Sequence, residues 1–146
     1  MFFALRVLLA LLGAAAVGIG SSIFLLGAEQ TAWMAERAYS ALTGWQGPLS
    51  EPWPPTADSE LRFYAAIWGA YGVVLLQAAA NLRAGGRQVP WLAGIFFLGG
   101  VGRALSWLSV GAPHPFFQLL MAIELALPLI LILLWTVVQG RELRSS

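Results

Sequence analysis

The chain has 146 residues, of which 59% are hydrophobic and only 10% are charged, and its formal net charge is +1. A soluble domain carries about 25% charged residues, so a chain this short with so few charges cannot cover a surface that faces water. The composition predicts a single domain in a lipid bilayer, and the near-zero charge excludes a nucleic-acid partner.

The residue types present also exclude several kinds of chemistry. The chain has no cysteine, which rules out disulfides, thiol redox centres and cysteine metal sites. Since His114 is the single histidine, a histidine-built metal centre would need carboxylates for its other ligands. All eight basic residues are arginine, which excludes Schiff-base chemistry on lysine. We therefore expect no cofactor and no metal.

The first apolar segment, 6–28, contains 22 uncharged residues between two charged ones. About 20 apolar residues span a hydrocarbon core of about 30 Å, so the segment predicts a transmembrane helix. A cleaved signal peptide is the alternative, but its apolar core runs about 7–15 residues and this one continues further. Gly13, Gly18 and Gly20 predict close packing of this helix against a neighbour.

The next segment, 30–59, is too long for a tight turn, and we assign it to an outer loop. Its first part carries an apolar stripe and is ended by Gly44, which predicts a short helix lying on the outer membrane surface. The four prolines of GPLSEPWPP then predict a stiff, extended connector. Trp33, Trp45 and Trp53 either anchor this loop at the interface or take part in binding. The stripe consists of Met34, Ala38, Ala41, Leu42 and Trp45.

Three further apolar segments, 60–82, 89–110 and 116–139, predict three more transmembrane helices. The second of these is interrupted only by Arg103, and the third only by Glu124. The predicted fold class is all-α, an integral membrane four-helix bundle with a short outer interfacial helix.

The arginines are unevenly divided between the two sides of these helices. Five flank one side, whereas the other side has two arginines and five carboxylates. Because arginine-rich loops stay in the cytoplasm, both termini are predicted to be cytoplasmic. The five arginines are Arg6, Arg83, Arg87, Arg141 and Arg144.

The two charges inside the last apolar segments are predicted to pair. The midpoint between positions 103 and 124 falls inside the turn GAPHP, so Arg103 and Glu124 lie at one depth of an antiparallel hairpin. About ten residues at ~1.5 Å each place them roughly 10–15 Å inward, where a lone charge costs at least ~2.5–3.5 kcal/mol. We predict an interhelical salt bridge, with Ser106 accepting a remaining guanidinium donor. Gly99, Gly102 and Ser106 are predicted to let another helix approach closely.

Other polar and aromatic residues are predicted to gather at the same outer end. With the Arg103–Glu124 pair they would frame an outward-facing cleft that binds a ligand. Alternatively they serve only packing and the electrostatics of helix ends, and the pair itself is either functional or structural. The candidates are Glu60, Arg62 and His114 for the polar site and Tyr64, Trp68 and Tyr71 for its aromatic lining.

Two stretches of the sequence resemble a known family. DSELRFYAAIWGAYG and FFLGGVGRALSWLSVGAPHPFFQLLMAIELALP, from about Asp58 to Pro128, are similar to domain-of-unknown-function family 4345. The resemblance implies a small four-helix protein of the bacterial inner membrane. The family carries no established activity, so the resemblance assigns no catalytic residue. The matching positions are Glu60, Arg62, Phe63, Gly99, Gly100, Arg103, Ser106, Gly111, Pro113, His114 and Glu124.

Three functions remain open. We favour a membrane protein without catalysis, in contact with membrane lipids, that associates with a larger membrane complex or with a lipid-like ligand. The alternative is a small-molecule binder or proton-coupled transporter that uses the Arg103–Glu124 pair, although pairing keeps Glu124 charged and opposes proton carriage. The second alternative is an enzyme acting on a lipid head group, with Glu60 or His114 as acid or base.

Overall fold

The computed structural model of the chain describes residues 1–82 and 86–142. These residues form five α-helices and one 3₁₀ turn, without strands, so the predicted all-α fold class is confirmed. Arg83 and Arg144, which entered the orientation prediction, lie outside the described residues, and so does the side chain of Arg141. The elements are α1 (Phe2–Leu26), α2 (Ala28–Thr43), α3 (Pro55–Ala80), η1 (Gly86–Gln88), α5 (Val89–Val110) and α6 (Pro115–Glu142).

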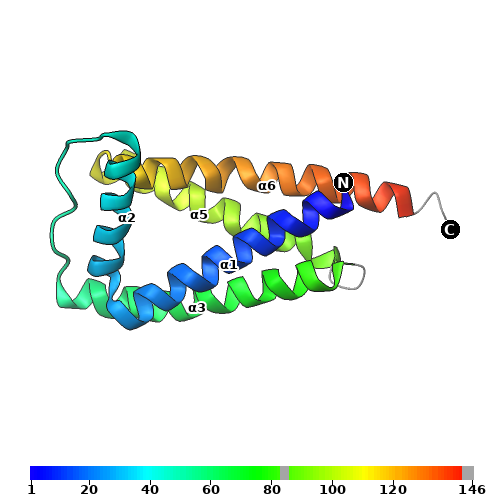
Figure 1. Cartoon of the computed structure of the whole chain (residues 1–146), viewed down its shortest axis with the longest axis horizontal. Helices are drawn as coiled ribbons and strands as arrows, with labels where there is room; N and C mark the ends of the chain where they lie inside the picture. Colours follow the sequence, from blue (N-terminus) through cyan, green and yellow to red (C-terminus); the bar gives the residue numbers. More distant parts are fainter. Residues whose placement is uncertain (83–85, 143–146) are drawn as a thin grey trace.

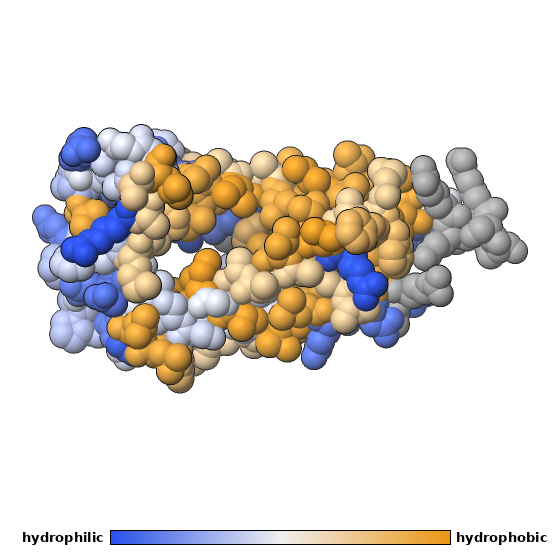
Figure 2. All heavy atoms as spheres, in the orientation of Figure 1, coloured by the Kyte–Doolittle hydropathy of each residue, from blue (hydrophilic) through white to orange (hydrophobic). Residues whose placement is uncertain are grey.

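Four helical segments are long and apolar enough to cross a membrane: α1, α3, η1 with α5, and most of α6. Their outward surface is apolar between the two ends of the molecule, and hydrophilic side chains gather toward those ends (Figure 2). Large apolar side chains such as Trp91 and Leu108 stand almost fully exposed on it. Such a surface is unfavourable in water and is what a hydrocarbon surrounding requires.

Prolines and glycines set several helix ends. α3 begins at Pro55, before the predicted start at residue 60, because a proline in the first turn has a preset φ and no N–H to lose. Gly27, with a φ of 93°, ends α1, and α2 follows directly from it. Gly44 ends α2 in the left-handed conformation, at the predicted position. Residues 44–54 form the connector from α2 to α3, so the predicted loop 30–59 is mostly helical.

The long helices form two antiparallel pairs, and α2 crosses one end of the molecule (Figure 1). α1 packs against α3 and α5 against α6. Glycines let the first pair approach closely: a Cβ at Gly20 would lie 2.8 Å from the carbonyl oxygen of Ala65, and one at Gly13 would lie 2.9 Å from that of Gly72. Gly18 was also predicted at this seam, which is wrong, because it faces open space.

The hydrophobic core occupies the half of the bundle away from α2. It is built from the first half of α1, the second half of α3, the first half of α5 and the second half of α6. Each helix contributes a stripe with a spacing of three or four residues, as burial of one helical face requires. The principal core residues are Leu5, Leu9, Leu12, Ala16, Tyr71, Leu75, Leu82, Val89, Leu92, Phe96, Leu131 and Val138.

Candidate functional site

The two helix pairs separate toward α2 and leave the molecule open between them there (Figure 2). We call this space the opening. The stripe of α1 that is buried from Leu5 to Ala16 continues toward α2 with the same spacing but is less covered there: Ile19 is 41% exposed and Leu26 is 53% exposed, while Ile23 between them is half-buried. The core therefore stops about halfway along the bundle, and apolar side chains line the space beyond it.

The predicted aromatic stripe of α3 divides at this boundary. Tyr71 is buried, and its hydroxyl donates a hydrogen bond to the Leu92 carbonyl oxygen of α5 at 2.8 Å. The ring of Trp68 stacks on that of Tyr71, with centroids 5.2 Å apart. Tyr64, nearer α2 on the same stripe, is 57% exposed. Tyr71 thus belongs to the core and Trp68 packs against it, also stacking on Phe96, while Tyr64 continues the stripe beyond the core.

Arg103 follows Gly100 on the buried stripe of α5, on the side of Phe96 that is nearer α2, and pairs there with Glu124 of α6. The guanidinium Nε of Arg103 donates to Glu124 Oε2 at 2.7 Å, and the side chains are 38% and 9% exposed. The two charges lie on facing sides of α5 and α6, as their equal distance from the turn requires. Gly100 allows this approach, because a Cβ there would lie 3.0 Å from that of Glu124.

Within the described residues, the close contact between α5 and α6 is made at Gly100, and not at Gly99 or Gly102. Neither has any atom within 4 Å of where its Cβ would stand. At about 100° per residue, Gly100 falls in the middle of the buried stripe of α5, whereas Gly99 lies at its edge and Gly102 well outside it. Ser106 lies on this outer face too. It is exposed and makes no hydrogen bond with Arg103, so it does not accept the remaining guanidinium donor.

Most donors of Arg103 remain unused. Neither of its two Nη atoms has a hydrogen-bond partner within the described part of the chain. The Phe117 ring of α6 lies beside the guanidinium, with its centroid 5.7 Å from the central carbon. Trp107, one turn closer to α2 on α5, is partly exposed. Arg103 thus presents free N–H groups in an aromatic surrounding.

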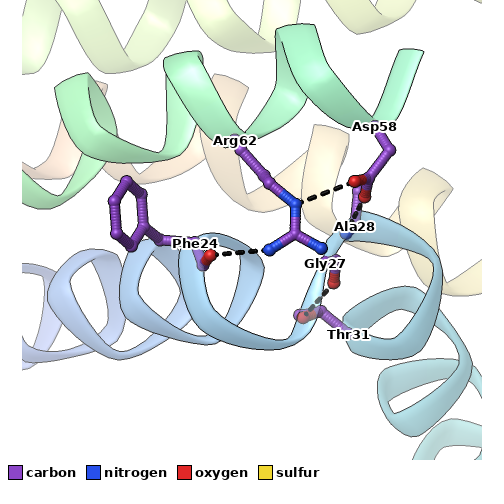
Figure 3. A network of polar contacts seen from close by, with 6 residues as sticks. All are labelled: Phe24, Gly27, Ala28, Thr31, Asp58 and Arg62. Carbon is purple, nitrogen blue, oxygen red and sulfur yellow. Dashed lines mark hydrogen bonds and ion pairs between the residues drawn. The ribbon is translucent and has the colours of Figure 1, made fainter. Parts of the chain in front are cut away.

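Arg62 belongs to a different network, at the junction of α1, α2 and α3 (Figure 3). Its Nε donates to Asp58 Oδ2 and its Nη1 to the Phe24 carbonyl oxygen in the last turn of α1, both at 2.8 Å. Asp58 Oδ1 accepts the N–H of Ala28, the first residue of α2, at 3.0 Å. The cation lies at the negative end of α1 and the carboxylate at the positive end of α2, which stabilises both charges. Gly27 is needed between them, since a Cβ there would lie 2.7 Å from Arg62 Nη2.

His114 holds the α5–α6 turn against α2. Its ring centroid lies 4.2 Å from that of Trp45 and 5.8 Å from that of Tyr39. Nδ1 accepts the N–H of Phe116 at 3.1 Å, and Nε2 is buried without a partner in the described residues. The aromatic contacts and the Nδ1 bond assign this histidine to the packing of the turn.

Glu36 of α2 was not predicted to belong to any site, yet it is fully buried. Its carboxylate accepts hydrogen bonds from the Ser50 N–H, at 2.9 Å, and from the Ser50 hydroxyl. A buried carboxylate needs such partners, because an unpaired charge is costly away from water. Glu36 thereby fastens the connector to α2.

The signal for this burial lies in the spacing along α2. Ala28, Ala32 and Glu36 repeat every four residues and form the buried face of the helix. The helical members of the predicted stripe, such as Met34 and Leu42, are exposed, whereas its last member, Trp45, packs against His114. The sequence signal for the burial of Glu36 was therefore its position on the same helical face as Ala28 and Ala32.

The predicted cleft is only partly assembled. Arg103 and Glu124 pair with each other, but Glu60 is exposed and neither it nor Arg62 makes a hydrogen bond or ion pair with them among the described residues. His114 packs against Tyr39 of α2 and Trp45 of the connector. Within residues 1–82 and 86–142, no three histidine or carboxylate side chains are grouped to hold a metal ion.

A family model described as Domain of unknown function (DUF4345) matches residues 4–135. The match confirms the resemblance and extends it over α1, α2 and the connector, which the two quoted stretches did not cover. No curated protein and no solved structure matches the chain at a significant level. Since the family model covers most of its length, the chain belongs to the DUF4345 family.

Proposed function

We propose that the chain is an inner-membrane protein without catalysis that binds a lipid-like molecule in the opening between its helix pairs. The observation that carries the proposal is the exposure, beside α2, of the same helical stripes that form the core at the other end. If the four long helices closed over these stripes, their side chains would pack against one another. In the open arrangement these van der Waals contacts are missing along half of the bundle. A ligand with an apolar body restores that packing.

The side chains around the opening are those of a ligand site. Ile19 and Leu26 supply aliphatic surface, Tyr64 supplies aromatic surface, and one ion pair supplies oriented polar groups. Ligand sites are mostly apolar with a few convergent polar groups, which is the composition found here.

The proposed orientation places the α2 end on the outer side of the membrane, with both termini in the cytoplasm. In the sequence, the segments on the α2 side carry two arginines, Arg37 and Arg62, whereas the segments on the other side carry five, among them Arg6 and Arg87. This asymmetry follows the positive-inside rule. The Arg103–Glu124 pair then lies within the hydrocarbon, where pairing offsets much of the cost of each charge.

The two alternatives have less support. A proton-coupled transporter needs a carboxylate that is free to change its charge, whereas Glu124 is bonded to Arg103 at 2.7 Å. A head-group enzyme needs an acid and a base that converge, whereas Glu60 and His114 lie on different elements and neither bonds to the ion pair within the described chain.

The experiment compares two tryptophan substitutions on α1. Ile19→Trp fills the opening, and Leu25→Trp fills instead a shallow groove of about 420 Å³ between α1 and α3. Each variant is purified in gentle detergent, and the lipids that remain bound are counted by native mass spectrometry. We expect Ile19→Trp to lose a bound lipid that wild type and Leu25→Trp retain. The reverse result, or equal retention in all three, contradicts the proposal.

Association with a membrane complex is a second candidate, which the exposed face of α5 favours. Gly99, Gly102 and Ser106 stand there uncovered, and small residues in such a row let a second helix approach closely. Extraction of native membranes should then give a partner at fixed stoichiometry, which Gly102→Leu removes. A wild-type chain that extracts alone rejects this candidate.

A further inference from the structure

Arg62 and Arg103 use their donors differently. Arg62 donates from Nε and Nη1 to acceptors supplied by the chain, at 2.8 Å each. Arg103 donates only from Nε, and its Nη atoms have no partner in the described residues although the side chain is partly exposed. A guanidinium carries five N–H donors, and unsatisfied donors among apolar helices are costly. Arg103 is therefore arranged to hold an acceptor that the chain does not supply.

Glu124 restricts the charge of that acceptor. Its carboxylate lies 2.7 Å from Arg103 and neutralises it. A second anion at the guanidinium would leave one negative charge uncompensated in a surrounding of low dielectric constant. An uncharged oxygen, such as that of a carbonyl group, takes the free donors without this penalty.

We infer that the opening takes an uncharged lipid whose carbonyl oxygen accepts hydrogen bonds from the Nη atoms of Arg103. This inference rests on the proposed binding function and names the class of ligand. The apolar body of the lipid lies along the exposed stripes of α1 and α3, represented by Ile19 and Tyr64. The Phe117 ring, which lies against the guanidinium of Arg103, limits the orientations that this group can adopt. The ester groups of a diacylglycerol and the ring of a lipid quinone both carry such carbonyl oxygens.

The test measures the binding of three probes to the purified full chain in detergent: dioctanoylglycerol, a decyl-substituted benzoquinone and dioctanoyl phosphatidic acid. We expect at least one uncharged probe to bind wild type about tenfold or more tightly than the phosphatidic acid, since the phosphate would leave a negative charge uncompensated beside the ion pair. Preference between the two uncharged probes distinguishes the ester source from the quinone source.

Two variants of the pair and one control sharpen the test. Glu124→Gln leaves the positive charge of Arg103 uncompensated, so phosphatidic acid should bind about tenfold tighter than in wild type. Arg103→Met combined with Glu124→Leu removes the donors without leaving a lone charge, and should weaken the uncharged probe by about tenfold. Glu51→Gln, an exposed change in the connector, should alter neither affinity.

The outcomes separate this inference from the function on which it rests. A wild type that prefers phosphatidic acid, or that binds neither uncharged probe, overturns the inference. So does a double variant that binds the uncharged probe as tightly as wild type. The proposed function is tested separately, by counting the lipids that remain bound to Ile19→Trp and Leu25→Trp. It fails if Ile19→Trp retains the lipid that wild type binds.

Discussion

At the scale of single residues, two of the three arginines whose hydrogen bonds are described bond to the carboxyl end of a neighbouring helix, and the third pairs with a carboxylate. Arg6 Nη2 donates to the Ala80 carbonyl oxygen at the end of α3, and Arg62 Nη1 donates to that of Phe24 at the end of α1. Each helix of this antiparallel pair thus caps the carboxyl end of the other, where a cation is favoured. Arg103 instead pairs with a carboxylate from the side of its helix and keeps donors free.

The ion pair predicts a specific pattern of stabilities. Arg103→Met alone leaves Glu124 as an unpaired charge among apolar helices and should destabilise the protein by about 1–3 kcal/mol. Adding Glu124→Leu removes that charge and should recover most of the loss, because an apolar pair of similar size is tolerated at a buried ion-pair site. Unfolding by denaturing detergent measures both variants.

A double variant that is less stable than Arg103→Met contradicts this account of the pair. In that case the ion pair would contribute more to the free energy of unfolding than the compensation of one charge by the other. Glu51→Leu, in the exposed connector, controls for the general effect of removing a carboxylate.

At the scale of the elements, hydropathy made the long helices predictable, because length and composition are local properties of the sequence. The depth of Arg103 and Glu124 was predictable for the same reason, since a hairpin fixes it by counting. The contact at Gly100, in place of Gly99 and Gly102, was not, because it depends on how α5 is rotated about its axis. The burial of Glu36 depends on the path of the connector, which several prolines leave open.

The glycine seam between α1 and α3 predicts opposite effects of one substitution at two positions. Gly20→Ala places a methyl group 2.8 Å from a backbone carbonyl oxygen and should destabilise the protein by about 1–3 kcal/mol. Gly18→Ala meets nothing within 4 Å and should stabilise it by up to about 1 kcal/mol, because alanine is the better helix former. Thermal unfolding in detergent measures both. Equal effects of the two changes would show that the pair does not pack through this seam.

Glu36 predicts the behaviour of the connector. Glu36→Ala removes the acceptor for both hydrogen bonds from Ser50, so residues 44–54 should detach from α2. We expect proteinase K to cleave this segment several-fold faster, because cleavage follows local opening. Glu51→Ala, which changes an exposed carboxylate of the same segment, is the matched control. Equal cleavage rates in the two variants would exclude this role.

At the scale of the whole molecule, the core and the opening divide the bundle. Tight packing holds the four helices together at one end, while α2, the connector and the α5–α6 turn join the two helix pairs at the other end (Figure 1). The sequence did not predict this division, since Leu12 and Ile19 look equivalent on one stripe. What distinguishes them is the divergence of the two helix pairs, which no local pattern encodes.

The orientation is testable because the chain has no cysteine to remove. Gln46→Cys, in the connector, should react with a membrane-impermeant maleimide added outside intact spheroplasts. Arg87→Cys, at the opposite end, should react only after the membrane is opened. The opposite labelling pattern would place the termini outside and the connector in the cytoplasm.

The most direct test of the central claim is an experimental structure of the full chain in lipid nanodiscs. The account predicts elongated density between the α1–α3 and α5–α6 pairs beside α2, with an oxygen within hydrogen-bond distance of the Arg103 Nη atoms. Helix pairs that close on each other, with Ile19 and Tyr64 buried against protein and no room between them, would contradict it.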